Sequence, residues 1–169
     1  MRTRGDGWAL RSGVMLGLIA ATVFLLAFPV KGGGGAMGLD VAIGSMPTGE
    51  LDVKPVGPFL RGAGLAPGDD PATGTLHARN QTGVTLSVGI NVLPSSSYSD
   101  GFLEVTATYE GSVILKGTVG DLRGMNHDLL TLESGESADI DVTAEVKSGA
   151  IGYQGRVEDV TFELHSEVR

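Results

Sequence analysis

Residues 152–168 read GYQGRVEDVTFELHSEV, and from Asp159 onward apolar and polar residues alternate along this stretch. Val160, Phe162 and Leu164 fall on one face, and the residues between them are polar. A period of two with branched and aromatic residues on one side is typical of a half-buried β-strand. Because a free apolar edge invites aggregation, we expect this strand to have partners on both sides. They must come from earlier in the chain or from another molecule.

Similar short runs recur along the chain and are separated by turns rich in glycine and proline. The clearest of them are residues 49–54, 73–79, 84–93, 102–109, 113–116 and 137–146. The chain has 27 glycines and no cysteine, so neither a disulfide framework nor a thiolate metal site is expected. This pattern predicts an all-β fold, an antiparallel two-sheet β-sandwich of jelly-roll type with about seven to nine strands.

Four places between these runs have recognisable turn or loop chemistry. Pro55–Pro71 is dense in proline and glycine and is predicted to be a loop that ends in a Pro-Gly-Asp turn. Leu132–Glu136 repeats that turn pattern without the proline, and we interpret the repeat as reuse of one turn. Glu110-Gly111 predicts a hairpin turn, and Thr118–Leu122 predicts a single helical turn.

The N-terminus has the parts of an export signal. Met1–Gly13 is basic and polar, and Val14–Val30 is an apolar stretch of 17 residues without a charge. Small residues follow, and Gly34 and Ala36 fit the positions recognised by a signal peptidase. We therefore predict a hydrophobic export helix within a signal peptide over residues 1–36, cleaved after Ala36. The alternative is an uncleaved membrane anchor, for which 17 residues is near the short limit.

The remainder of the chain is acidic. Residues 37–169 carry 8 basic and 19 acidic side chains, a formal net charge of −11. Such a surface repels nucleic-acid phosphate and anionic lipid headgroups. We therefore expect no nucleic-acid partner, and membrane contact only through the N-terminal segment before cleavage. Both interpretations of that segment predict a secreted or cell-surface protein.

No arrangement of catalytic or metal-binding residues is recognisable, so we predict no enzyme, no cofactor and no metal site. The histidines His77, His127 and His165 form no zinc-binding motif. Loop carboxylates at Asp69, Asp70, Asp100, Asp139 and Asp141 leave calcium as a weaker alternative. Asn80-Gln81-Thr82 is a glycosylation sequon on a predicted turn.

The segment 37–47 has two interpretations. Leu39, Val41 and Ile43 alternate with other residues, as in a strand with one buried face. The segment is therefore either the first strand of the domain or an extension that pairs with another subunit, a candidate donor strand. In the second interpretation the sandwich domain itself occupies residues 48–169.

Three places in the chain together resemble the TasA/camelysin family of exported β-sandwich proteins. Thr48–Val53 is similar to a Gly-Thr-Leu-Asp-Leu segment near the start of those domains. Leu65–Asp69, a strand and then Asn80–Gly83 resemble their Leu-x-Pro-Gly-Asp turn, strand and Asn-x-Gly turn. Tyr153–Gly155, leading into the strand at Val160–Leu164, looks like their closing Tyr-Gln-Gly strand. The order and rough spacing agree over nearly the whole predicted sandwich.

The resemblance implies a jelly-roll domain that forms extracellular fibres or biofilm matrix by donor-strand exchange. It implies copies of the same chain as partners, with a second surface or matrix protein as a further candidate. Strand addition of this kind takes affinity from backbone hydrogen bonds and specificity from alternate side chains. The expected interface residues are Leu39, Val41, Ile43, Val160, Phe162 and Leu164. One alternative is a monomeric or membrane-tethered binding domain; an enzyme, revealed by zinc bound at His77 or His165, is another.

Overall fold

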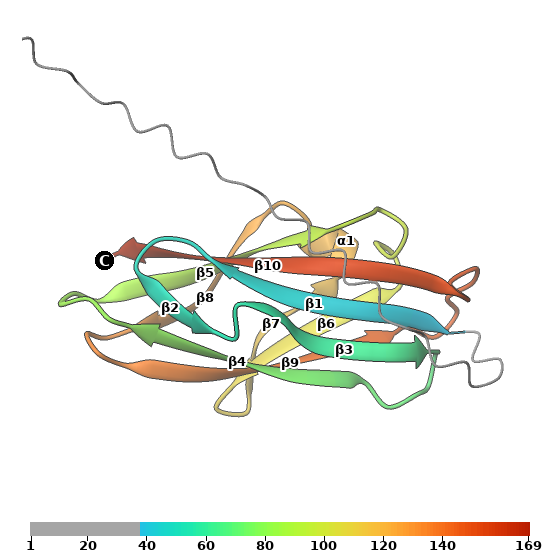
Figure 1. Cartoon of the computed structure of the whole chain (residues 1–169), viewed down its shortest axis with the longest axis horizontal. Coiled ribbons are helices and arrows are strands. Elements are labelled where there is room, and N and C mark those ends of the chain that lie inside the picture. The colour runs from blue at the N-terminus through green and yellow to red at the C-terminus, as the bar shows by residue number, and fades with distance from the viewer. Residues whose placement is uncertain (1–37) are drawn as a thin grey trace, which may run out of the picture. The chain divides into compact units, whose positions relative to one another are not determined.

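The computed structural model describes residues 38–169, which form two packed β-sheets (Figure 1). The predicted signal peptide 1–36 and cleavage after Ala36 lie outside the described residues. Within 38–169 no helix is long and apolar enough to cross a membrane. The prediction of an all-β two-sheet sandwich is confirmed.

Ten strands and one helical turn make up the described chain. The strands are β1 (Leu39–Pro47), β2 (Leu51–Lys54), β3 (Gly57–Leu65), β4 (Ala72–Asn80), β5 (Leu86–Pro94), β6 (Leu103–Tyr109), β7 (Ser112–Thr118), β8 (Asn126–Leu132), β9 (Ser137–Val146) and β10 (Arg156–Val168). The helical turn α1 (Val119–Leu122) lies between β7 and β8.

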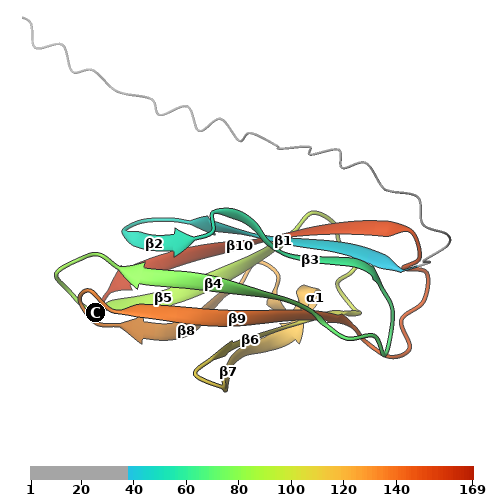
Figure 2. The same ribbon diagram turned by 60° about the horizontal axis from the view of Figure 1, so that its bottom comes forward.

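The strands form two sheets of five. Sheet A has the order β3-β1-β10-β5-β8, and sheet B has the order β2-β4-β9-β6-β7. The two layers lie face to face in both views (Figures 1 and 2). Within the described residues every strand pair is antiparallel except β1 with β10, which run in the same direction.

Strands β3 to β10 follow the path of an eight-stranded jelly roll. In that path the first and last strands, β3 and β10, would be direct neighbours in sheet A. Strand β1 lies between them and pairs with both. It is therefore an additional strand inserted into the middle of a sheet.

The core fills the space between the sheets with the inward residues of each strand. On β10 these are Val160, Phe162 and Leu164, all of them buried, as the alternation predicted. The ring of Phe162 also packs against Phe59 of β3, with 5.9 Å between ring centroids. Within residues 38–169 the buried core runs from Leu39 to Leu164. We expect a chain that begins at Met37 to fold on its own, because it contains this whole core.

The structure corrects the predicted loop at Pro55–Pro71. Most of that segment is strand β3, which has Leu60 fully buried on its inner face. Its glycines hide the alternation because they have no side chain, and the exposed Pro58 interrupts it because it is an apolar residue on the outside. This strand and the first one bring the number to ten, above the predicted seven to nine.

The predicted turns are confirmed. The amide of Asp69 donates to the carbonyl of Ala66 at 3.1 Å, and the amide of Glu136 donates to that of Glu133 at 3.0 Å. Both turns place a glycine with positive φ at the third position, Gly68 at 90° and Gly135 at 78°. In each, the acidic side chain also accepts from the amide three residues earlier. The same four-residue turn is therefore used twice.

The predicted helical turn is also confirmed as α1, with Thr118 as its N-cap. The Thr118 hydroxyl accepts from the Asp121 amide, and the Asp121 carboxylate accepts from the Thr118 amide. This reciprocal pair is a capping box. The Thr118 donors lower the pKa of Asp121, because they stabilise its ionised form.

Candidate assembly site

The six predicted interface residues come together in sheet A. Leu39, Val41 and Ile43 of β1 are buried, as are the three inward residues of β10. The two strands pair in register from Leu39 opposite Arg156 to Pro47 opposite Leu164, so that Ile43 lies opposite Val160. Figure 1 shows β1 and β10 side by side along their length. Strand β1 is thus paired within its own molecule, as the first-strand interpretation of residues 37–47 expects.

Strand β1 is flanked by β10 on one side and by β3 on the other. The sequence did not predict the part played by β3. Ile43 pairs with Leu60, and Leu39 pairs with Leu65, in an antiparallel ladder with two register shifts. The ladder with β10 has no shift over nine residue pairs. Taken without β1, the sheet would have an apolar slot between β3 and β10, closed at its base by the core.

Polar contacts fix both ends of β1. At one end the Gly155 amide donates to the Gly38 carbonyl at 3.0 Å, and the Gly64 amide donates to Asp40 Oδ1 at 2.8 Å. The Gly38 backbone approaches that of Gly64 so closely that a Cβ at residue 38 would lie 2.0 Å from its carbonyl carbon. We call this the Gly38 end of the sandwich.

The opposite end of β1 leads into a short connection. The Ser45 hydroxyl donates to the carbonyl of Pro55. The Thr48 amide and hydroxyl both donate to the Leu164 carbonyl, at 2.8 and 3.0 Å. We call this the Thr48 end. Only Thr48, Gly49 and Glu50 separate β1 from β2, which continues in the other sheet.

Near the Gly38 end β10 also carries a buried carboxylate. Glu158 is fully buried and accepts from the Ser95 hydroxyl at 3.1 Å and from the Ser96 amide and hydroxyl at 3.1 and 2.6 Å. Three donors give both carboxyl oxygens hydrogen-bond partners and fix the loop after β5 to the start of β10. The serine run 95–97 is a weak sequence signal of such a contact.

The three histidines do not come together. His77 is on the outer face of sheet B, where its Nδ1 lies 2.6 Å from Asp139 Oδ1. His165 is on the outer face of sheet A, above Gly89. His127 is in β8 and pairs with Ile90 of β5. Within residues 38–169 no three His, Asp or Glu side chains are arranged to hold a metal ion.

Four of the five carboxylates considered for calcium have other partners. Asp141 accepts from the Thr75 hydroxyl at 2.7 Å, and Asp139 pairs with His77. Asp100 forms an ion pair with Arg123, and Asp69 caps its own turn.

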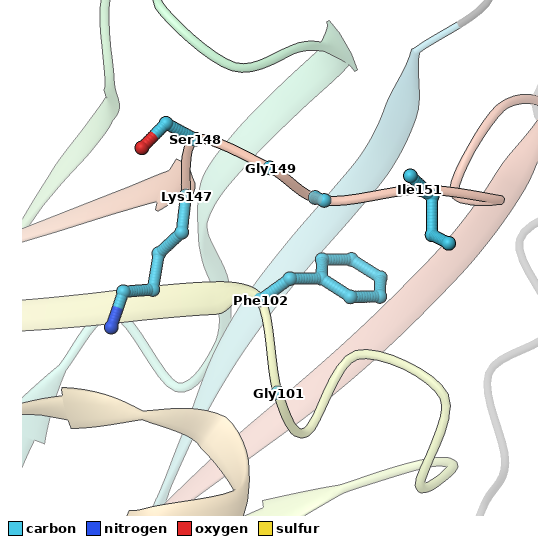
Figure 3. Close-up of a pocket in the computed structure, with 7 residues that line it drawn as sticks. Gly101, Phe102, Lys147, Ser148, Gly149 and Ile151 are labelled. Atoms are coloured by element: carbon cyan, nitrogen blue, oxygen red, sulfur yellow. The ribbon is translucent and has the colours of Figure 1, made fainter.

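A shallow hollow of about 330 Å³ lies near the Gly38 end, beneath the loop between β9 and β10 (Figure 3). The Phe102 ring lies beneath Gly149 and Ile151, and the Lys147 side chain extends away from the ring. The Lys147 ammonium lies 3.4 Å from Glu104 instead. Polar groups therefore do not converge in the hollow, and it gives no indication of a ligand.

Comparisons with known proteins do not identify the chain. No family model matches it. No curated protein matches it either. Among solved structures, the N-terminal domain of PorA is similar at a TM-score of 0.26 and 10% identity, over 76% of this chain and 87% of that one. A likeness this weak carries no argument. The position of β1 is the most informative feature of the molecule.

Proposed function

We propose that the protein is an exported structural subunit of an extracellular fibre or matrix, which assembles when β1 of one copy fills the slot of the next. The observation that carries this proposal is the insertion of β1 between the first and last strands of a jelly roll. Strand β1 pairs with a neighbour on each side, as any strand in the middle of a sheet does. Strand β1 is the first element of the described residues, and within them only the three-residue connection to β2 joins it to the rest.

The chemistry of the slot suits a strand from a second copy. Its walls offer backbone donors and acceptors on β3 and β10, and its floor is apolar. β-Strand addition uses these two features, the first for affinity and the second for side-chain selection. A contact between unlike surfaces that does not close on itself produces a filament. The predicted export signal would place that filament outside the cell.

The test is to keep β1 in its own sheet. Met46 and Glu163 are opposite each other on the outer face, so a Met46→Cys/Glu163→Cys chain beginning at Met37 can be crosslinked within one molecule. We expect the uncrosslinked variant to form filaments with a regular repeat in negative-stain electron microscopy, and the crosslinked one to remain monomeric. Filaments from the crosslinked protein would contradict strand exchange. This test is cleaner than deleting Leu39–Ser45, which also removes three buried core residues.

A second candidate function, a monomeric cell-surface binding domain, is favoured by the pairing of β1 within its own sheet. Under it, the amides of Val41 and Ile43 exchange slowly in a dilute monomer, and filaments are absent at every concentration. A stored monomer that later assembles shows the same slow exchange when dilute. The concentration series therefore separates the two functions.

A further inference from the structure

We infer that β1 runs antiparallel to β10 in the filament, the reverse of its direction within its own molecule. This inference rests on the proposed function and concerns the same slot. It follows from the direction of the slot walls and from the length of the connection after β1.

The slot accepts a strand in either direction. Strand β1 is parallel to β10 and antiparallel to β3, so β3 and β10 are antiparallel to each other. Any strand between them has one parallel and one antiparallel neighbour, and reversal only exchanges the two. Because alternation of period two is the same in both directions, Leu39, Val41 and Ile43 can still face the core.

The connection after β1 keeps Pro47 close to its own domain. Strand β2 is anchored by pairing with β4 and by the burial of Leu51 and Val53. The three residues between Pro47 and Leu51 can span roughly 14 Å at full extension. The nine residues of β1 are about 27 Å long, so the connection cannot reach the far end of a neighbouring domain.

If β1 enters the slot of another copy in the direction that it has in its own molecule, the two copies form a closed dimer. Pro47 would lie at the Thr48 end of the accepting copy, as it does in its own molecule. The Thr48 ends of the two copies would then meet and point in opposite directions. The displaced β1 of the accepting copy starts at that same junction and would fill the vacated slot of the first. Both strands are then used, and growth stops at a two-fold dimer.

Exchange in the reverse direction leaves the assembly open. Pro47 would enter at the Gly38 end of the accepting copy, and that copy's own β1 would leave from its opposite end to reach a third molecule. Reversal also makes the ladder with β10 antiparallel, the slightly more stable arrangement. The more stable antiparallel pairing would then be with β10, whose ladder with β1 has no register shift. The parallel pairing would be with β3, whose ladder with β1 has two register shifts.

The direction can be read by crosslinking in a chain that has no cysteine of its own. Met46, Val157 and Glu163 are on the outer face, and the last two are six residues apart on β10, roughly 20 Å. A short bis-maleimide spans less than half of that distance. Copies with Met46→Cys are mixed with an equal amount of Val157→Cys copies, or of Glu163→Cys copies, assembled and then crosslinked.

We expect crosslinked dimers from filaments that contain Met46→Cys and Val157→Cys, and none from those that contain Met46→Cys and Glu163→Cys. The opposite result would overturn the reversed direction while leaving filament formation established. Closed dimers that crosslink only through Glu163→Cys would overturn it as well. If no copies assemble, the proposed function fails and this inference with it. The Met46→Cys/Glu163→Cys double variant, crosslinked within a dilute monomer, verifies the fold and the reaction.

Discussion

Asn80 is a single buried residue that holds the turns of both sheets together. Its Nδ2 lies within 2.7 to 3.0 Å of the carbonyls of Val84, Leu132 and Glu133, and its Oδ1 accepts from the amide and hydroxyl of Thr82. The side chain is fully buried, so the predicted sequon is closed to a glycosyltransferase once the protein has folded.

We expect Asn80→Ala to lower the free energy of unfolding by about 2 to 4 kcal/mol, because it leaves several buried polar groups without partners. Urea unfolding measures the change. Thr82→Val removes only one of the Asn80 contacts. The other two hydrogen bonds that it removes, with the amide and carbonyl of Val84, are exposed, so it should cost less. Equal losses for the two variants would contradict the central role of the Asn80 amide.

Glu104 gives the fold a pH-dependent contribution. Its side chain, 11% exposed, lies 3.0 Å from the Lys116 ammonium and 3.4 Å from that of Lys147. The hydrogen bond from Lys116, followed by that from Lys147, lowers the pKa of Glu104 below its ordinary value of 4.5, although partial burial acts in the opposite direction. A carboxyl whose pKa is lower in the folded state stabilises the fold above its unfolded-state pKa, and loses that effect as the pH falls through the folded value.

We therefore expect Glu104→Gln to destabilise the protein by about 1 to 2 kcal/mol at pH 7. The difference from the unsubstituted protein should shrink as the pH falls below 4.5, the ordinary pKa of this carboxyl. Urea unfolding between pH 7 and pH 3 measures it. Asp70→Asn, on an exposed loop, is the matched control and should show little difference at any pH. A gap that stays constant with pH would contradict an ionic origin.

At the scale of the strand, the inner face of β1 stabilises the monomer. Ile43 is fully buried between Val160 and Leu60. We expect Ile43→Ala to lower the free energy of unfolding by about 2 to 4 kcal/mol, the usual cost of a large-to-small change in a core. Ala42→Ser, on the outer face of the same strand, is the control. If both variants unfold at the same urea concentration, β1 is not packed as described.

The sequence predicted the elements whose alternation is complete. It missed a strand without clear alternation, and it missed polar residues whose partners are distant. Val160, Phe162 and Leu164 follow a strict period of two, and they form the buried face of β10 as expected. Strand β3 has glycine at three of its nine positions and proline at a fourth, and it was predicted to be a loop. Glu158 and Asn80 are polar residues that are buried only because long-range folding supplies their donors and acceptors. No local sequence pattern predicts these hydrogen-bond partners.

The candidate site was predicted in part for the same reason. Alternation identified Leu39, Val41 and Ile43 as an apolar strand face, but not which strands would flank it. The partners of a strand depend on sheet order, which follows from the packing of the whole domain. Thr48, whose amide and hydroxyl both bind Leu164, has no sequence signal because its partner is 116 residues away.

For the whole molecule, charge should control assembly. Residues 37–169 have a formal net charge of −11, so two copies repel each other as they approach. This repulsion extends over about 30 Å at an ionic strength of 0.01 M, but over only about 8 Å at 0.15 M, because salt screens it. The slot itself is apolar and backbone-mediated, so screening should weaken the repulsion without weakening the contact.

We therefore expect the concentration needed for filaments to fall several-fold when sodium chloride is raised from about 0.01 to 0.15 M. Light scattering and negative-stain microscopy on a chain beginning at Met37 measure the threshold. The Met46→Cys/Glu163→Cys protein, crosslinked within each molecule, is the control and should not assemble at either salt concentration. Assembly that weakens with added salt would mean that ion pairs, and not strand insertion into an apolar slot, hold the copies together.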